Sequence, residues 1–112
     1  MSSDCIFCKI VNGDIPSKKI YEDEDVIAFN DIRPIAPVHF LIVSKEHIES
    51  LASCDVSHEK LLGKMLLLAP NLALKHGLKG FRTMINTGSE GGQEVFHIHI
   101  HVFGGGTVLP KT

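Results

Sequence analysis

Three histidines alternate with apolar residues near the C-terminus, at His97, His99 and His101. Alternate side chains of a β-strand point to the same face, so a strand over 95–103 would carry three imidazoles on one face. A neutral imidazole can attack phosphorus, accept a proton or bind a metal, and a charged one can neutralise a phosphate. The alternatives are three solvent-facing polar residues, or a set of metal ligands without catalysis.

The segment before these histidines, TGSEGGQE at 87–94, is rich in glycine. Glycines let the backbone approach a phosphate closely and turn its N–H groups inward. The segment is neither a Walker A loop nor a Rossmann fingerprint, because it lacks Gly-Lys-Ser/Thr and leads into a strand. A hairpin turn explains it equally well, but its place before three histidines favours a phosphate-binding loop.

The cysteines suggest a second kind of chemistry. Cys5 and Cys8 form a C-x-x-C pair, which in a chain without a secretion signal indicates metal binding or redox chemistry. Two buried structural cysteines on a short helix are the simpler alternative, and no thioredoxin-like unit surrounds the pair. Cys54 stands alone and is interpreted as an ordinary free thiol.

The elements that must hold these groups predict an α+β fold with an antiparallel sheet. Asp4 is the expected cap of a short helix that ends near Gly13. The expected strands and the loop after the second one are listed in chain order: a strand end and turn at 21–25, strands at 26–29 and 38–43 with a proline-containing loop at 31–37 between them, and strands at 81–86 and 95–103.

One long helical pattern begins at Asp55 or Ser57, and Gly77 and Gly80 end it. Pro70 falls inside this pattern and is expected to kink or split the helix, because proline removes a backbone hydrogen bond. A doubly wound parallel sheet would need more helices than the chain contains.

Composition narrows the class of protein. The 112 residues carry 11 Lys and Arg against 13 Asp and Glu, with 44% apolar residues, which is typical of a single globular domain spanning 1–112. The charge of −2 argues against a nucleic-acid binder, and the apolar runs are too short to cross a membrane. No signal peptide is visible, so we expect a cytoplasmic protein.

Four segments together resemble the histidine-triad (HIT) family, in its Hint branch. They are GGQEVFHIHIHVFGG at 91–105, CIFCKIVNGDIPS at 5–17, YEDEDVIAFNDIRPIAPVHFLIVSKEHI at 21–48 and FRTMINTGSEGGQEV at 81–95. The resemblance covers nearly the whole chain and is weakest from 49 to 79. Asn86 and the pair Gly104-Gly105 favour the Hint branch over the dinucleoside-polyphosphate branch.

The resemblance implies a homodimer that shares one sheet, with a nucleotide site on each subunit. It implies hydrolysis of purine nucleoside 5′-phosphoramidates or acyl-nucleotides to the nucleoside monophosphate. His99 would attack the α-phosphorus and form a covalent nucleotidyl-histidine, with its other ring nitrogen donating to the His97 carbonyl. His101, His39 and Asn86 would surround the phosphate or the histidines.

The substrate-binding residues implied by the resemblance come from three segments. Asp31 would accept hydrogen bonds from the ribose, although it could instead stabilise a turn. The backbone N–H of Val95 would stabilise developing charge, and Gly92 lies in the phosphate loop. Glu94 replaces the serine of the animal members and lies near the leaving group. The expected base pocket is lined by Ile6, Phe7, Ile10, Phe29 and Ile32, which could equally be ordinary core.

Family members that keep the cysteine pair bind zinc, and the matching ligands here are Cys5, Cys8, His47 and His97. We therefore expect one structural zinc per chain and no organic cofactor. Two other functions stay open at this point. The chain could be a nucleotide-binding or scaffolding protein with incidental turnover, or a zinc protein that uses the triad only as ligands.

Overall fold

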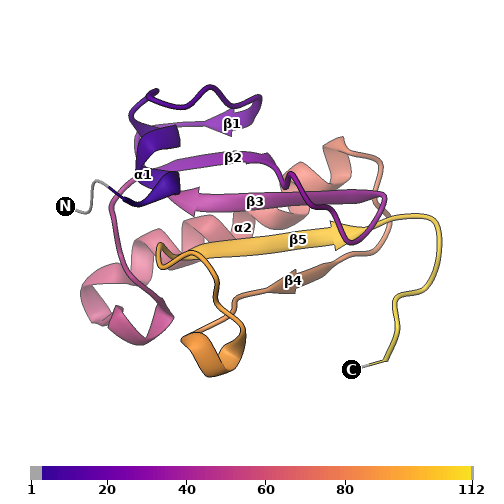
Figure 1. Cartoon of the computed structure of the whole chain (residues 1–112). Helices are drawn as coiled ribbons and strands as arrows, with labels where there is room; N and C mark the ends of the chain where they lie inside the picture. The colour runs from indigo at the N-terminus through magenta and orange to yellow at the C-terminus, as the bar shows by residue number, and fades with distance from the viewer. Residues whose placement is uncertain (1–3, 112) are drawn as a thin grey trace.

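The computed structural model describes residues 4–111 and contains one five-stranded antiparallel sheet (Figure 1). The strands are β1 (Lys19–Glu22), β2 (Val26–Asn30), β3 (Val38–Ser44), β4 (Arg82–Met84) and β5 (His99–Gly104). Their spatial order is β1-β2-β3-β5-β4, so β3 and β5 are neighbours at the centre although a long helix separates them in sequence. The predicted α+β fold with an antiparallel sheet is confirmed.

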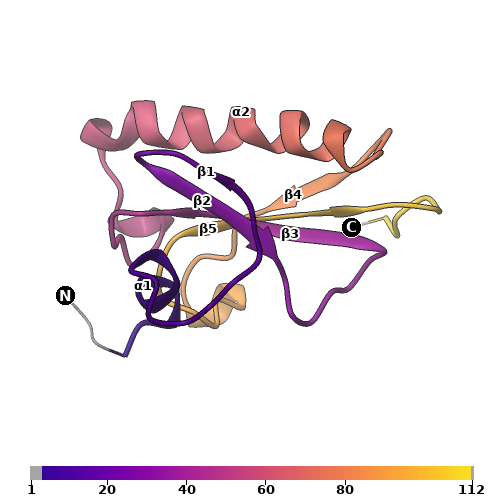
Figure 2. The same cartoon turned by 90° about the horizontal axis from the view of Figure 1, so that it is seen from above.

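The two faces of the sheet carry different helices. Helix α2 (Glu59–Lys75) lies across one face, and the short helix α1 (Ile6–Val11) lies against the other (Figure 2). Three short 3-10 helices, Leu51–Ser53, Val56–His58 and Ser89–Gly91, complete the described residues. No helix within 4–111 is long and apolar enough to cross a membrane.

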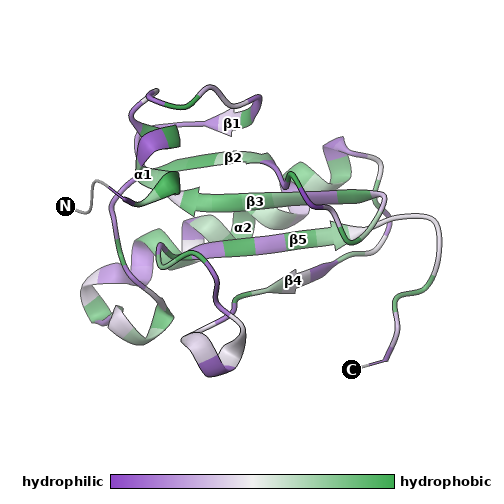
Figure 3. Cartoon of the chain, in the orientation of Figure 1, coloured by the Kyte–Doolittle hydropathy of each residue, from purple (hydrophilic) through white to green (hydrophobic). Residues whose placement is uncertain are grey.

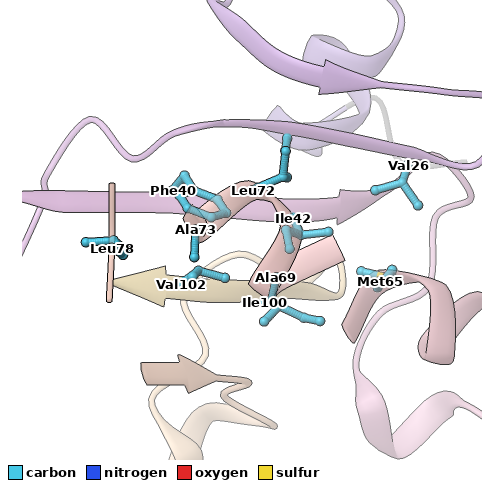
Figure 4. Close-up of a cluster of buried hydrophobic side chains, with 11 residues drawn as sticks. Val26, Phe40, Ile42, Met65, Ala69, Leu72, Ala73, Leu78, Ile100 and Val102 are labelled. Atoms are coloured by element: carbon cyan, nitrogen blue, oxygen red, sulfur yellow. The ribbon is translucent and has the colours of Figure 1, made fainter. Parts of the chain in front are cut away.

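The main hydrophobic core lies between α2 and the sheet (Figure 4). Met65, Ala69 and Leu72 of α2 are buried against Phe40 and Ile42 of β3. Residues of β2, β3 and β5 that point the other way form the α1 side, where Leu41 and Val43 pack with Phe7. The central strands therefore have an apolar neighbour on both faces, which explains why β3 is apolar throughout (Figure 3).

Three expectations from the sequence were wrong. The cap of α1 is Cys5, whose sulfur accepts a hydrogen bond from the Cys8 N–H at 3.3 Å, and not Asp4. Pro70 does not split α2, which runs unbroken from Glu59 to Lys75. Pro70 and Leu66 are both exposed, so water can reach the carbonyl that proline leaves without a donor.

The third correction concerns the last strand, which begins at His99 and not at 95. Residues 95–98 approach the sheet as an irregular segment, tied by a hydrogen bond from the Ile98 N–H to the Ile48 carbonyl at 2.7 Å. His97 therefore lies outside the strand, and the three histidines do not share one strand face.

Candidate active site and metal centre

His99 and His101 point to the α1 face of the sheet because β5 alternates. They pair with Val43 and Leu41 of β3, while Ile100 and Val102 enter the core under α2. This alternation is visible along β5 in Figure 3. The same side chains that anchor β5 thus fix the direction in which its two imidazoles point.

The His99 ring is held by the backbone of His97. Its Nδ1 lies 2.7 Å from the His97 carbonyl oxygen, and because a carbonyl can only accept, Nδ1 carries the proton and donates it. The other ring nitrogen, Nε2, keeps its lone pair. Burial lowers the pKa of His99, and the hydrogen bond to His97 and the charge of Asp31 oppose this effect only in part. The site thus holds a neutral, oriented imidazole that can act as a nucleophile or base.

A second group joins three side chains from different segments. His39 Nε2 on β3 lies 2.9 Å from His101 Nδ1 and 3.4 Å from Asp31 Oδ2. His39 Nδ1 accepts the Ile35 N–H at 3.1 Å, so the proton of the neutral ring is on Nε2. His39 therefore donates to His101, whose own proton is then on Nε2.

Asp31 also holds the loop after β2. Its Oδ1 accepts the Arg33 N–H at 2.8 Å, which is a turn-stabilising contact, while Oδ2 faces the two histidines. The turn role left open by the sequence is thus present, and it does not prevent a second role for Oδ2.

The structure brings Cys5, Cys8, His47 and His97 together, with one donor atom of each within 4.8 Å of every other. His97 Nδ1 lies 3.3 Å from Cys5 Sγ and 3.6 Å from Cys8 Sγ, and His47 Nδ1 lies 3.1 Å from Cys8 Sγ. Sulfur and nitrogen ligands of one tetrahedral zinc are separated by about 3.6 Å, from Zn–S and Zn–N bonds of about 2.3 and 2.0 Å. The four residues could therefore bind a metal ion.

The surroundings of the cluster favour metal binding further. His97 donates from Nε2 to the Ser44 carbonyl at 2.6 Å, which leaves Nδ1 as a lone pair directed at the sulfurs. Burial, together with the neighbouring Cys5 sulfur, raises the pKa of Cys8 to about 11. A buried thiolate here needs a cation to stabilise it, and two thiolates with two neutral imidazoles are a typical zinc ligand set.

The apolar residues predicted for a base pocket divide into two groups. Phe7, Ile10 and Phe29 are buried together, and the Phe7 ring meets the His99 ring edge-on with centroids 4.9 Å apart. Ile6 is partly exposed, and Ile32 is 89% exposed on the loop after β2. The structure therefore joins the first group to the histidines and leaves Ile32 facing solvent.

The glycine-rich segment contains the 3-10 helix Ser89–Gly91 and a left-handed Gly92 with φ of 84°. Sequence reasoning missed Gln93, which is buried and supports this segment. Its side chain accepts the Gly88 N–H at 2.8 Å and donates to the carbonyls of Glu49 and Val95 at 2.7 and 3.1 Å. A glutamine amide flanked by Gly-Gly and Glu in a polar loop was the available signal, but the sequence did not indicate its burial.

The remaining predicted residues lie around this segment. Asn86 is half-buried after the end of β4, Val95 packs on the α1 side, and Glu94 is exposed. Glu94 and Val95 also line a hollow of about 370 Å³ together with Cys5 and His47. The phosphate-loop residues and the cysteine cluster are thus close neighbours.

Comparisons with known proteins agree with this architecture. A family model described as scavenger mRNA decapping enzyme C-terminal binding matches residues 4–108. Protein HitA of Neisseria gonorrhoeae is 52% identical over 101 residues, which cover 89% of this chain and 94% of HitA. The purine nucleoside phosphoramidase of Escherichia coli K12 is 41% identical over 112 residues, covering 98% of this chain and 94% of the relative.

A solved HIT family hydrolase from Clostridium thermocellum superposes with a TM-score of 0.94 at 42% identity, covering 99% of this chain and 98% of the other. An open antiparallel sheet with two imidazoles of one strand held beside a glycine-rich loop is the arrangement of the histidine-triad proteins. The chain belongs to the histidine-triad (HIT) family, and the comparisons support the hydrolase class.

Proposed function

We propose that this protein hydrolyses purine nucleoside 5′-phosphoramidates or acyl-nucleotides to the nucleoside monophosphate. The observation that carries the proposal is the hydrogen bond from His99 Nδ1 to the His97 carbonyl at 2.7 Å, which leaves Nε2 as a free nucleophile. The name of the Escherichia coli relative, a purine nucleoside phosphoramidase, supports the substrate class.

The reaction would follow two displacements. His99 Nε2 attacks the α-phosphorus, the bond from phosphorus to the departing amine or acyl oxygen breaks, and a nucleotidyl-histidine forms. Water then attacks the same phosphorus, the bond to His99 breaks, and the nucleoside monophosphate leaves. Splitting the reaction in this way replaces a poorly placed water by an imidazole that the protein has already oriented.

The other predicted residues take roles around the phosphate and the nucleoside. His101 and His39 contact the phosphate through the Nε2–H of His101, and Asn86, Gly92 and the Val95 N–H complete the phosphate site. Asp31 Oδ2 binds the ribose, and the base lies against the apolar wall formed by Ile6, Phe7, Ile10, Phe29 and Ile32. Glu94 is the acidic group nearest the departing amine.

Zinc is the metal proposed for Cys5, Cys8, His47 and His97, in a structural role. When bound, it would supply a fixed link among the four side chains. We also propose a homodimer, supported by the short edge strand β4 and by exposed leucines on α2. Cytoplasmic location is expected because Cys5 and Cys8 must stay reduced to bind the metal.

Two other functions are less well supported. Only His97 of the triad lies in the cysteine cluster, so a protein that uses all three histidines as ligands of one zinc does not fit the geometry. A nucleotide-binding protein with incidental turnover uses the same pocket and is separated by experiment.

The test is to incubate the purified protein with adenosine 5′-phosphoramidate and to measure AMP release by wild type and His99→Ala. Loss of the nucleophile should lower kcat by at least about a thousandfold while AMP binding changes little. His58→Ala, which changes a histidine remote from the site, is the control. Wild-type turnover by the His99→Ala variant would exclude the covalent mechanism, and binding without turnover by wild type would favour the scaffolding function.

A further inference from the structure

His97 belongs to both the metal cluster and the candidate active site. Its side chain directs Nδ1 at the sulfurs of Cys5 and Cys8, at 3.3 and 3.6 Å. Its carbonyl oxygen accepts the proton of His99 Nδ1 at 2.7 Å. One residue thus connects the two sites directly.

Helix α1 makes a second connection. It carries Cys8 and is capped by Cys5, and between these two residues Phe7 contacts the His99 ring at 4.9 Å and the Phe29 ring at 5.6 Å between centroids. Six residues are too few for a helix to be stable by itself, so α1 persists only while it is docked. Its docking contacts are three buried side chains and the two sulfurs that face His47 and His97.

We propose that a metal bound to Cys5, Cys8, His47 and His97 positions α1 against His99, so that metal occupancy controls nucleotide affinity. The nucleotide part of this inference rests on the proposed function. The inference goes beyond a structural zinc, because it makes α1, the wall of the nucleotide pocket, the element that metal loss releases.

The two connections respond differently to metal loss. His97 is fully buried, and its ring is also held by the Ser44 carbonyl at 2.6 Å, so the His97 carbonyl stays in place without the metal. Helix α1 has no comparable second anchor from its cysteines. Metal loss should therefore weaken nucleotide binding more than it slows the chemical step.

His47→Ala is the variant that separates these effects. His47 follows β3, lies off α1, and reaches the cluster through Nδ1, 3.1 Å from Cys8 Sγ. The variant removes one ligand and leaves the sequence of α1 intact. Zinc content, amide hydrogen exchange of residues 6–11 and the Kd of AMP are measured on the full chain, with and without added zinc sulfate.

We expect the variant to lose most of its zinc and residues 6–11 to exchange faster. If α1 is then docked for a tenth of the time, the Kd of AMP rises about tenfold. The kcat for adenosine 5′-phosphoramidate should change by less than about threefold, because uniform binding is lost. Wild-type protein stripped with a chelator should behave in the same way and recover with zinc sulfate.

Cys5→Ser and Cys54→Ser form a matched pair, since Cys54 lies outside the cluster with its Sγ near the Ser50 carbonyl. Only Cys5→Ser should reproduce the His47→Ala result. The proposal is overturned if zinc is lost while exchange and AMP affinity stay unchanged, or if wild type takes up no zinc. A wild type that releases no AMP contradicts the proposed function instead, and the exchange measurement still decides the role of α1.

Discussion

The carboxylate of Asp31 lies 3.9 Å from Nδ1 of His101, and yet the pKa of His101 falls from 6.5 to about 4. Burial is the largest cause, followed by the neighbouring imidazoles of His99 and His39, and Asp31 compensates only in part. A histidine beside a carboxylate is often protonated, but desolvation decides here. The pair of His39 and His101 is therefore neutral near pH 7 and shares protons by hydrogen bonding.

This relationship predicts how stability depends on pH. Between pH 6.5 and 4 the unfolded chain binds a proton at His101 and the folded protein does not, so the free energy of unfolding falls as the pH falls through this window. The slope is at most about 1.4 kcal/mol per pH unit for one such group. Burial lowers the pKa of His39, His97 and His99 in the same direction, which steepens the fall.

Urea unfolding from pH 4.5 to 7.5 measures this slope. His101→Asn should flatten it, while His58→Gln should leave it unchanged. Asp23, whose pKa is lowered by hydrogen bonds from Tyr21 and Lys64 against the opposing effect of burial, loses its contribution only below its ordinary value of 3.8 and stays outside this window. Equal slopes for wild type and His101→Asn would contradict the prediction.

Gln93 is expected to be the residue on which the glycine-rich segment depends most. Gln93→Ala removes three hydrogen bonds and leaves the Gly88 N–H and the Glu49 carbonyl without these partners. A loss of about 1–3 kcal/mol in the free energy of unfolding follows from leaving such groups unsatisfied. Urea unfolding tests this, with the exposed loop residue Glu90→Ala expected within about 0.5 kcal/mol of wild type.

The dimer prediction concerns the outer surface of α2. Leu67 and Leu74 are 74% and 75% exposed and are seven residues apart, so they lie on one helix face. A second copy that covers this face explains why two leucines are exposed. Light scattering at micromolar concentration should give a dimer for wild type and a monomer for Leu67→Glu. Val56→Glu, at an exposed residue off this face, should stay dimeric, and a monomeric wild type would refute the proposal.

The sequence predicted those parts of the fold that depend on local patterns. Strand β3 followed from an apolar β-branched run, and β2 and α2 from theirs, because periodicity records which face is buried. The HIT resemblance supplied the pairing of Cys5 and Cys8 with His47, which no local pattern contains.

Long-range contacts set the features that the sequence did not predict. His97 looks like a strand residue in HIHIHV, but the cysteines of α1 and the Ser44 carbonyl hold its side chain outside the strand. Pro70 was expected to break α2, and its exposed position makes the missing hydrogen bond tolerable. The buried Gln93 depends on Glu49, 44 residues away, and pattern reasoning cannot detect such a partner.

The proposed function also predicts how selective the enzyme is for its leaving group. The nucleoside and α-phosphate would contact Asp31, the glycine-rich segment and the histidines, which are mostly held by hydrogen bonds. Glu94, by contrast, is exposed, and the tail at 107–111 is largely exposed with no regular secondary structure. The departing amine should therefore meet an open, hydrated surface and not a shaped pocket.

We expect a preference for purine nucleotides, broad tolerance of amine size and poor action on dinucleoside polyphosphates. The measurement compares kcat/KM for small and bulky amines on one nucleoside, in wild type and Glu94→Gln. Tolerance means a ratio well below about a hundredfold, because a hundredfold ratio is about 2.7 kcal/mol of transition-state discrimination and requires specific contacts. A larger ratio in wild type would reveal a leaving-group pocket. If Glu94 orients the amine, Glu94→Gln should lower kcat/KM for all amines by a similar factor, whereas a loss confined to bulky amines would assign Glu94 to selectivity instead.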